Sequence, residues 1–371
     1  MRKTINHSES YIELNLDYMN WNLKKVRNRA KVPLMAVIKN NGYGHGLVEI
    51  GKHLDAQNIH YLMVGKLQEA LDLRIAGVKC PILNFGPFSP KESEVLLYQN
   101  ISQSICTADI HSLNKAAEKF DKKANIHIQI DTGMGRMGIS YYEALPAIEK
   151  IYRFKNILIA GVSTTLTEDP DFDRIQLERF ATICKKAEEK GLELGMKHAA
   201  SSGALLDLPD AYLDLIRPGI VLYGYYPSPR TQEKDSLSLR PVLQLKSFVA
   251  AVKTLRSGDS TSYHRFYVAK KKERIALIAM GYADGYPFRI MGQGCVLIGG
   301  KRYPIKGDIT ANHMMVGLKN DSRVFPGDEV VLIGTQGDET ITAYDLGKWA
   351  GTSSYKILLS LNPLLPKKVL S

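Results

Sequence analysis

The chain has few cysteines, and their spacing excludes the usual metal-binding motifs. Only 4 of its 371 residues are cysteine, namely Cys80, Cys106, Cys184 and Cys295. They lie far apart, whereas zinc motifs pair cysteines that are a few residues from each other. So few cysteines also do not indicate a disulfide framework. We interpret them as small buried apolar residues of a protein in a reducing compartment, and we expect no metal site.

Long apolar segments are also absent. No run of about 18 apolar residues, the length that crosses a bilayer, occurs in the chain. Residues 1–9 are polar and contain no apolar core of a secretion signal. Internal repeats and low-complexity tracts are absent. We therefore predict a cytoplasmic protein with no membrane partner, and the sequence leaves open whether it is part of a longer one.

Acidic residues are in the minority. Lysine and arginine number 49 against 38 aspartate and glutamate, which gives a formal net charge of +11. A basic excess is one property of proteins that bind nucleic acids. Here the basic residues are scattered, and the densest run, Lys270-Lys271-Lys272, is short. We interpret them as a solvated surface and expect no nucleic acid partner.

Short apolar runs alternate with helical patterns over roughly the first two thirds of the chain. Tyr11–Leu16 alternates like a half-buried strand, and Met19, Leu23 and Val26 then repeat at helical spacing. Eight strand-then-helix units predict an α/β fold with a parallel (β/α)8 TIM barrel, whose functional groups lie at the carboxyl ends of the strands. The expected strands are 33–39, 61–66, 81–86, 101–106, 125–131, 158–164, 196–201 and 216–223. The expected helices lie near 46–56, 68–76, 89–97, 108–119, 141–152 and 173–190.

Beyond about residue 238 the pattern changes to short, β-rich segments separated by Gly, Pro, Asp and Asn. These segments are 244–254, 274–280, 295–299, 303–306, 314–317 and 329–334, followed by one helix near 343–350. We predict a barrel domain over 1–237 and a C-terminal mostly-β domain over 238–371. Residues 1–16 precede the first barrel unit and are available to pair with the β domain.

A lysine ends the first apolar strand of the barrel, in the string Ala36-Val-Ile-Lys-Asn-Asn-Gly-Tyr-Gly-His-Gly46. At the mouth of a barrel Lys39 would be partly desolvated, which lowers the pKa of its amine and favours the neutral form that a Schiff base needs. Position alone favours an ordinary lysine at a strand end. The whole string, with glycines for tight turns and the Tyr43 hydroxyl, resembles the cofactor-lysine motif of the alanine racemases, which are fold-type III pyridoxal-phosphate enzymes.

The resemblance to this family continues in the same order along nearly the whole chain. Each matching segment contains a residue that can contact a cofactor or a substrate, and every segment except Thr261–His264 also contains glycine. The segments are Asp131-Thr-Gly-Met-Gly-Arg-Met-Gly138, His198-Ala-Ala-Ser-Ser-Gly203, Leu215-Ile-Arg-Pro-Gly-Ile-Val-Leu-Tyr-Gly224, Thr261-Ser-Tyr-His264, Met280-Gly-Tyr-Ala-Asp-Gly-Tyr-Pro287 and Gly351-Thr-Ser-Ser-Tyr-Lys-Ile-Leu358.

The resemblance implies an isomerase that uses pyridoxal 5'-phosphate to interconvert L- and D-alanine, which supplies a D-amino acid for the cell wall. Racemisation needs a base on each face of the α-carbon, because one base returns the proton to the face it left. Lys39 would carry the cofactor and be one base, and Tyr263 from the partner subunit of a head-to-tail homodimer would be the other. The implied cofactor contacts are Lys39, Tyr43, Arg136, His198, Ser202, Arg217, Gly219, Ile220 and Tyr355. The implied substrate contacts are Arg136, Tyr282 and Ala311.

Several residues depart from the family pattern, and they lie around the expected substrate. Thr165 replaces a histidine that hydrogen-bonds the catalytic tyrosine, and Gln129 replaces a lysine that braces Arg136. Ser201 replaces an asparagine, and Thr310-Ala311-Asn312 replaces Cys-Met-Asp. The short Ala311 side chain leaves room for a longer substrate.

These departures leave other functions open. The chain suits a racemase of another amino acid, such as serine, lysine or ornithine, and equally a low-activity pyridoxal-phosphate-binding paralogue. A fold-related decarboxylase would need contacts for a diamine and usually a catalytic cysteine, where this chain has Thr310. A non-catalytic cofactor carrier has only the barrel, whereas this chain also has the β domain and Tyr263.

Overall fold

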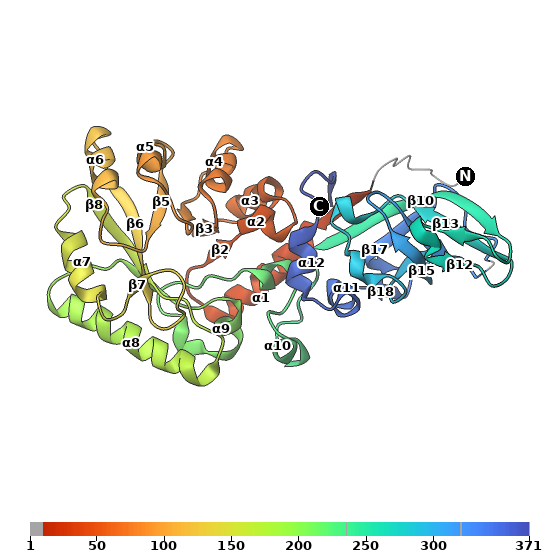
Figure 1. Cartoon of the computed structure of the whole chain (residues 1–371). Coiled ribbons are helices and arrows are strands. Elements are labelled where there is room, and N and C mark those ends of the chain that lie inside the picture. Colours follow the sequence, from red (N-terminus) through yellow and green to blue (C-terminus); the bar gives the residue numbers. More distant parts are fainter. Residues whose placement is uncertain (1–9, 235, 320, 371) are drawn as a thin grey trace. The chain divides into compact units, whose positions relative to one another are not determined.

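The computed structural model describes residues 10–370 except 235 and 320, and these residues form two compact units (Figure 1). The barrel unit comprises residues 19–42 and 47–240, and the β unit comprises residues 10–18, 43–46 and 241–370. The segment 43–46 belongs to the β unit although both of its flanks belong to the barrel unit. The predicted lysine motif, 36–46, is therefore shared between the two units.

Parallel strands form the sheet of the barrel unit and confirm the predicted fold class. Their order in the sheet, β2-β3-β4-β5-β6-β8-β9, is their order along the chain, and β7 (Ile139–Ser140) pairs with β6 outside this path. Most of their residues are buried, as expected for strands covered by helices outside and filled by side chains inside. The strands are β2 (Met35–Val37), β3 (Tyr61–Val64), β4 (Ile82–Asn84), β5 (Ile101–Ile105), β6 (Ala124–Asp131), β8 (Ile157–Ser163) and β9 (Met196–His198).

An extended segment at 214–218 occupies the eighth position of the barrel. Leu34 forms a parallel bridge with Ile216, and the Val37 amide donates to the Pro218 carbonyl. On the other side the Arg217 amide donates to the Ala200 carbonyl over 2.8 Å. The predicted strand 216–223 is wrong in its second half, because residues 220–223 form the 3₁₀ helix η3 (Ile220–Tyr223). Pro218 has no amide hydrogen, so it cannot continue the pairing as a central strand would.

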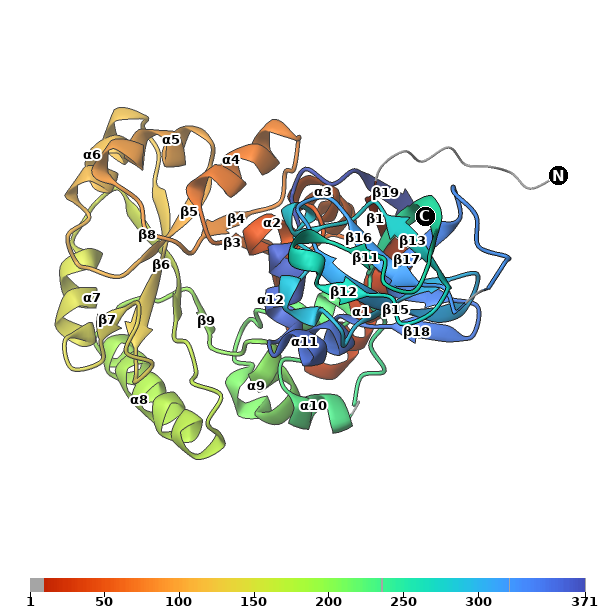
Figure 2. The same ribbon diagram turned by 45° about the vertical axis from the view of Figure 1, so that its right-hand side comes forward.

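Helices lie outside the strands of the barrel unit (Figures 1 and 2). The expected helix 173–190 begins earlier, at Pro170, because proline is tolerated in a first turn and the Asp169 carboxylate caps the Asp171 and Phe172 amides. The expected helix 89–97 is divided into η1 (Pro90–Glu92) and α5 (Ser93–Tyr98). The others are α1 (Leu16–Ala30), α3 (Leu47–Ala56), α4 (Leu67–Ile75), α6 (His111–Lys119), α7 (Ala144–Tyr152), α8 (Pro170–Glu189), α9 (Ser202–Asp207), η2 (Pro209–Ala211) and α10 (Pro229–Lys234).

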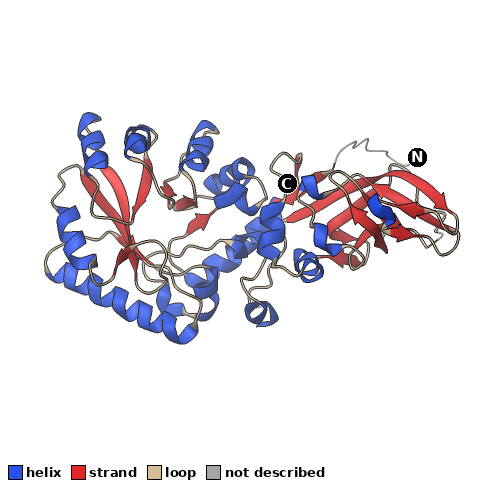
Figure 3. Ribbon diagram, viewed as in Figure 1, coloured by secondary structure: helices blue, strands red, loops and turns tan. Residues whose placement is uncertain are grey.

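The β unit is mostly strand (Figure 3). Its nine-stranded sheet has the order β18-β17-β14-β15-β16-β13-β10-β1-β19, and β10 also pairs with β17, which closes part of the sheet on itself. β1 pairs with β10 antiparallel and with β19 parallel. The strands are β1 (Tyr11–Asn15), β10 (Leu243–Leu255), β13 (Glu273–Ile278), β14 (Cys295–Ile298), β15 (Lys301–Ile309), β16 (Met314–Gly317), β17 (Glu329–Gln336), β18 (Glu339–Ile341) and β19 (Lys367–Leu370). Two short strands, β11 (Ser260–Thr261) and β12 (Tyr267–Val268), pair separately.

Two helices follow the last hairpin of the β unit. α11 (Ala343–Ala350) matches the predicted helix, because the Thr342 and Asp345 side chains form a capping box at its start. It ends at Gly351, whose φ of 64° is the left-handed conformation that glycine adopts at little cost. The turn carries the chain into α12 (Ser354–Ser360), which contains Tyr355.

The described residues contain neither a disulfide nor a helix that is both long and apolar enough to cross a membrane. Cys184 is buried as expected. Cys80, Cys106 and Cys295 are only half-buried, so the interpretation of all the cysteines as core residues is partly wrong.

Candidate functional site

Lys39 lies at the carboxyl end of β2 and begins a left-handed turn, α2 (Lys39–Tyr43). Asn40, Asn41 and Gly42 have φ values of 54°, 56° and 59°. This conformation is unfavourable for most residues, and asparagine and glycine tolerate it best. The Asn41 side chain holds the turn, since its Oδ1 accepts from the Leu47 amide over 2.9 Å. The backbone that carries Lys39 is therefore fixed by local sequence.

The Glu69 side chain ties this turn to the next strand of the barrel. Its Oε1 accepts from the Asn41 amide over 3.1 Å, and its Oε2 accepts from the Gly65 amide over 3.0 Å. A Cβ at position 65 would lie 3.3 Å from the Lys39 Cβ, so a glycine leaves the lysine stem room. Sequence analysis missed Glu69, because no local pattern distinguishes it from any other acidic residue in the first turn of a helix.

The surroundings of Lys39 favour its neutral amine. Burial lowers the pKa of the amine, the positive charge of Arg136 lowers it further, and Glu69 opposes both effects. Arg136 itself is exposed, and no described residue accepts a hydrogen bond from its guanidinium. Gln129 stands at the position that the family resemblance assigns to a residue bracing Arg136, but its side chain contacts other residues. Gln129 accepts from the Ser163 hydroxyl over 2.6 Å and donates to the Thr165 hydroxyl over 3.2 Å.

Arg217 is buried and uses four of its five N–H groups inside the barrel. Nη1 donates to Nδ1 and to the backbone oxygen of His198, over 2.7 and 2.6 Å. Nη2 donates to the backbone oxygens of Thr164 and Ala199, over 2.7 and 3.0 Å. Only the Nε–H remains without an acceptor among the described residues. A guanidinium has no acceptor atom, so this group can bind only a ligand atom that carries a lone pair.

The hydrogen bond from Arg217 decides which ring nitrogen carries the hydrogen in two buried histidines. Because Nδ1 of His198 must accept from Arg217, its hydrogen is on Nε2, which lies 2.8 Å from Nδ1 of His127. His127 then carries its own hydrogen on Nε2, which has no partner among the described residues. Gly161 makes the contact possible, since a Cβ there would lie 2.5 Å from Nδ1 of His127. His127 was not predicted as part of the site.

Both histidines are held neutral. Burial lowers the pKa of His127 to about 3, and the charge of Arg217 adds to the effect. Burial, Arg217 and His127 lower the pKa of His198. An unfolded histidine has a pKa of about 6.5. Between about pH 6.5 and 3 the unfolded chain thus binds a proton at position 127 that the native chain does not, so folding stability falls as the pH falls.

We expect His127→Asn to flatten this pH dependence. Its loss should reduce the slope of unfolding free energy against pH by up to about 1.4 kcal/mol per pH unit below about pH 6. Urea unfolding at a series of pH values measures the slope, which is independent of any uniform destabilisation by the substitution. His60→Asn, at an exposed histidine, is the matched control and should leave the slope as it is. An unchanged slope in His127→Asn would contradict a neutral buried histidine.

Ser202, Gly219 and Ile220 lie at one turn of the same unit. The Ser202 hydroxyl accepts from the Gly219 amide over 2.9 Å and brings the start of α9 against the start of η3. The amides of Ile220 and Val221 open η3 and have no acceptor among the described residues. Free amides at the start of a helical turn suit a phosphate. Ser201, which precedes this turn, caps α9 with its backbone only.

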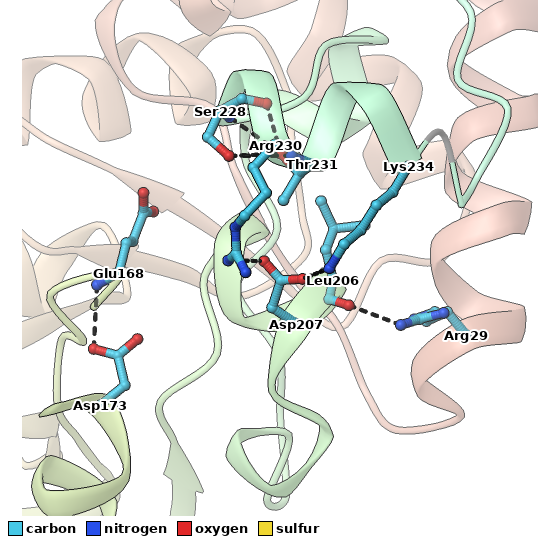
Figure 4. A network of polar contacts seen from close by, with 9 residues as sticks. All are labelled: Arg29, Glu168, Asp173, Leu206, Asp207, Ser228, Arg230, Thr231 and Lys234. Carbon is cyan, nitrogen blue, oxygen red and sulfur yellow. Dashed lines mark hydrogen bonds and ion pairs between the residues drawn. The ribbon is translucent and has the colours of Figure 1, made fainter. Parts of the chain in front are cut away.

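Gly203, which follows Ser202 in the chain, lines a cavity that holds more carboxylates than cations. This cavity has a volume of about 410 Å³ and is lined by Glu168, Asp173 and Asp207, among others. Burial raises the pKa of Glu168, and Asp173 and Asp207 raise it further. Figure 4 shows that Asp207 pairs with Arg230 and Lys234, over 2.5 and 3.1 Å, so these cations are already neutralised. With Glu168, Asp173 and Asp207 against Arg174 and Arg230, this cavity suits a phosphate less well than the free amides of η3 do.

Tyr43 and Tyr355 lie together in the β unit. Their ring centres are 5.9 Å apart, and the rings meet edge to face at 61°. Tyr43 is buried, and burial raises the pKa of its hydroxyl, which therefore remains a hydrogen-bond donor. Gly44, at φ 83°, packs against α12 so closely that a Cβ there would lie 2.0 Å from the Leu358 carbonyl oxygen. A bulkier residue at position 44 would separate the two tyrosines.

Tyr263, Tyr282 and Ala311 line one cavity of the β unit, with a volume of about 390 Å³. The Tyr282 amide donates to the Thr310 carbonyl over 3.0 Å, and the Ala283 amide donates to the Ala311 carbonyl over 2.9 Å. These two bonds bring distant segments of the sequence together. Tyr263 is 72% exposed and belongs to a strained turn, η4 (Tyr263–Arg265), in which His264 has a φ of 56°.

The predicted site residues therefore fall into three groups. Lys39, Arg136, His198, Ser202, Arg217, Gly219 and Ile220 belong to the barrel unit. Tyr43 and Tyr355 belong to the β unit, as do the cavity residues Tyr263, Tyr282 and Ala311. The free Nε–H of Arg217, the free amides at η3 and the amine of Lys39 match the ring nitrogen, the phosphate and the aldehyde of pyridoxal phosphate, so the residues present fit this cofactor.

Comparison with known proteins gives consistent matches over both units. Residues 14–227 match the family model "Alanine racemase, N-terminal domain", and residues 242–369 match "Alanine racemase, C-terminal domain". The chain is 39% identical to an alanine racemase of Carboxydothermus hydrogenoformans, over 96% of this chain and 98% of that protein. It is 34% identical to an alanine racemase of Methanococcus maripaludis, over 96% of this chain and 97% of that protein.

Solved structures agree with these matches. An alanine racemase of Clostridium difficile 630 superposes with a TM-score of 0.92 at 31% identity, over 98% of this chain and 96% of that one. A histidine racemase of Leuconostoc mesenteroides subsp. sake superposes with a TM-score of 0.90 at 26% identity, over 99% of this chain and 100% of that one. Two proteins with this architecture are thus named as racemases of different amino acids, alanine and histidine.

Proposed function

Because the chain belongs to the alanine racemase family, we propose that it is a pyridoxal-phosphate-dependent racemase that interconverts L- and D-alanine. The observation that carries the proposal is the half-buried Lys39, whose amine has a lowered pKa and lies in the same unit as the free donors of Arg217 and η3. A neutral amine is the form that bonds to an aldehyde. The Nε–H of Arg217 then matches the ring nitrogen of the cofactor, and the free amides of η3 match its phosphate.

Donors that no described residue engages support the cofactor assignment, namely the Nε–H of Arg217 and the amides of Ile220 and Val221. Ser202, Gly219 and Ile220 would bind the phosphate, and the family resemblance adds the hydroxyls of Tyr43 and Tyr355 as further phosphate contacts. The Nε–H of Arg217 would donate to the ring nitrogen, which must then be unprotonated to accept. The bound cofactor acidifies the hydrogen on the substrate's α-carbon by withdrawing its electrons. By holding that nitrogen unprotonated, Arg217 would limit the withdrawal of electrons and favour return of the proton over other reactions.

Two side chains would exchange protons with the α-carbon, one on each face. Lys39 serves one face through its amine. Tyr263 serves the other through its hydroxyl, while Arg136 and the Ala311 amide hold the substrate carboxylate. Tyr282 lines the same cavity as Tyr263 and would orient the Tyr263 side chain. With a base on each face, the proton that leaves from one side is replaced from the other, and this inverts the centre.

We propose that Tyr263 comes from the partner subunit of a head-to-tail homodimer. The family resemblance suggests this arrangement, and the surface around Tyr263 supports it. Phe266, Val268, Tyr282 and Phe288 are all exposed on the described β unit near this turn or its cavity. Monomeric proteins rarely leave several large apolar side chains exposed together, whereas a subunit interface buries them.

A racemase of another amino acid is the second candidate, and one observation favours it. Ala311 is small and lines the cavity beside Tyr263, and a structural neighbour is named a histidine racemase. The decarboxylase alternative gains no support, because the Thr310 hydroxyl is engaged with the His313 carbonyl over 2.9 Å and offers no thiol. The non-catalytic carrier is disfavoured because the chain matches both family domains.

Incubation of the holoenzyme with L-alanine tests the proposal. We expect D-alanine to accumulate until the two enantiomers are equal, because they have the same free energy in solution. The holoenzyme should also have a visible absorbance band from cofactor bound to lysine. If the band is absent, the cofactor assignment is wrong. If the band is present and only another amino acid is racemised, the second candidate is correct.

A further inference from the structure

Asp308 is a carboxylate in the cavity that holds Tyr263, and sequence analysis did not identify it. Among the described residues that line this cavity, Asp308 is the only Asp or Glu. The lining contains no Lys and no Arg. Oδ1 of Asp308 is buried and has no hydrogen-bond partner among the described residues. The side chain also takes part in none of the ion pairs of the described chain. No described lysine or arginine therefore forms an ion pair with this carboxylate.

The backbone directs Asp308 toward the Tyr263 turn. Strand β15 changes register against β16 between Ile305 and Ile309, so Asp308 lies in an irregular stretch of strand, and such bulges re-aim side chains next to active sites. The Asp308 amide donates to the Ser262 hydroxyl over 3.1 Å. Gly307 allows this approach, because a Cβ there would lie 2.7 Å from the Thr261 hydroxyl oxygen. The carboxylate is therefore held by its backbone beside the residue that precedes Tyr263.

The rest of the cavity suits a cation. Tyr282 and Phe288 meet edge to face with ring centres 6.2 Å apart, and Tyr263 adds a third ring. Faces of aromatic rings attract ammonium and guanidinium groups. A buried carboxylate oxygen without a partner costs free energy, which a charge-assisted hydrogen bond from a ligand would recover. The short Ala311 side chain leaves a path for a substrate side chain longer than a methyl group.

We propose that Asp308 selects amino acids whose side chain ends in a cation, such as lysine, ornithine or arginine. The inference rests on the proposed function, since it assumes that the cavity around Tyr263 receives the substrate. Asp308 pairs with the terminal ammonium or guanidinium, and the rings cover its apolar stem. Alanine lacks this group, so it is a substrate without the additional contact.

Paired substrates that differ only in the terminal charge test this inference. For the wild-type holoenzyme we expect kcat/KM for racemisation of L-lysine to exceed that of L-norleucine about 10- to 100-fold, the value of one charge-assisted hydrogen bond. D308N should reduce the ratio toward one, because the amide keeps the shape and removes the charge. D338N, which removes a charge from an exposed turn of the same unit, should leave the ratio as it is.

Binding of amino acids that cannot react separates this inference from the proposed function. α-Methyl-lysine and α-methylnorleucine have no α-hydrogen, so calorimetry measures their affinities whether or not the enzyme racemises anything. Tighter binding of α-methyl-lysine to the wild type, and equal binding of both to D308N, would support the inference. Equal affinities in the wild type would overturn it even if alanine is racemised. A preference for α-methyl-lysine with no racemisation of any amino acid would uphold the inference and overturn the proposed reaction.

Discussion

Lys39→Ala is expected to reduce kcat for racemisation by about four orders of magnitude or more, because the variant loses one of its two proton-transferring groups together with the attachment point of the cofactor. The amine at this position is half-buried, and burial lowers its pKa toward the neutral form that bonds to an aldehyde. The visible absorbance band of the holoenzyme should disappear with the activity. Spectra and rates at saturating cofactor measure both effects.

Lys66→Ala is the matched control for this prediction. Lys66 also follows a strand of the barrel, at the end of β3, but its side chain is exposed. This variant should keep the band and the rate of the wild type. Circular dichroism of both variants would establish that they fold alike. A Lys39→Ala variant that retained the band and the rate would contradict the assignment of the cofactor to this residue.

Tyr263→Phe is expected to have the second largest effect, a loss of about 10²- to 10⁴-fold in racemisation, and the loss should be one-sided. The hydroxyl serves only one face of the α-carbon, while Lys39 still serves the other. In deuterium oxide the variant should continue to exchange the α-hydrogen of one enantiomer and should fail to invert it. The wild type should exchange and invert both. Mass spectrometry combined with chiral separation measures the two outcomes separately.

Tyr98→Phe is the matched control, since Tyr98 is 69% exposed and Tyr263 is 72% exposed. Removing a hydroxyl from such a surface should leave both rates unchanged.

Subunit exchange tests whether Tyr263 acts in its own chain or in the partner chain. Mixed dimers of Lys39→Ala and Tyr263→Phe chains contain one intact pair of bases only if the tyrosine crosses to the partner, so equal mixing should restore about a quarter of the wild-type activity. No restoration would mean that Tyr263 acts within its own chain.

Local sequence was sufficient to predict most of the barrel and to propose most of the residues of the candidate site. Alternating strand and helix patterns predict a parallel barrel because each unit must bury one face against the next. Glycines next to Lys39 and Arg136 mark strand ends, where a barrel gathers its functional groups. The helix at 343–350 followed from a capping box and a terminal glycine that are neighbours in the sequence. These features depend on residues only a few positions apart.

Features that depend on long-range register were beyond sequence analysis. His127 contacts His198 only because β8 lies between their strands and has Gly161 at the point where they meet. Glu69 holds the Lys39 turn only because α4 follows the neighbouring strand. Each of these side chains is ordinary in its own sequence environment. Its role arises from a partner many residues away.

By itself, then, the sequence determined the family and the barrel and predicted the residues that we propose bind a cofactor, because each depends on short strings whose conformation is local. The tertiary structure alone decided that Arg217 has one free donor, that two histidines are neutral and that Asp308 lines the Tyr263 cavity with one oxygen that no described residue engages. The physical reason is that hydrogen-bond satisfaction and burial are properties of the packed chain. In an unfolded chain the same residues would be solvated, the histidines would titrate normally, and Asp308 would not distinguish one amino acid from another.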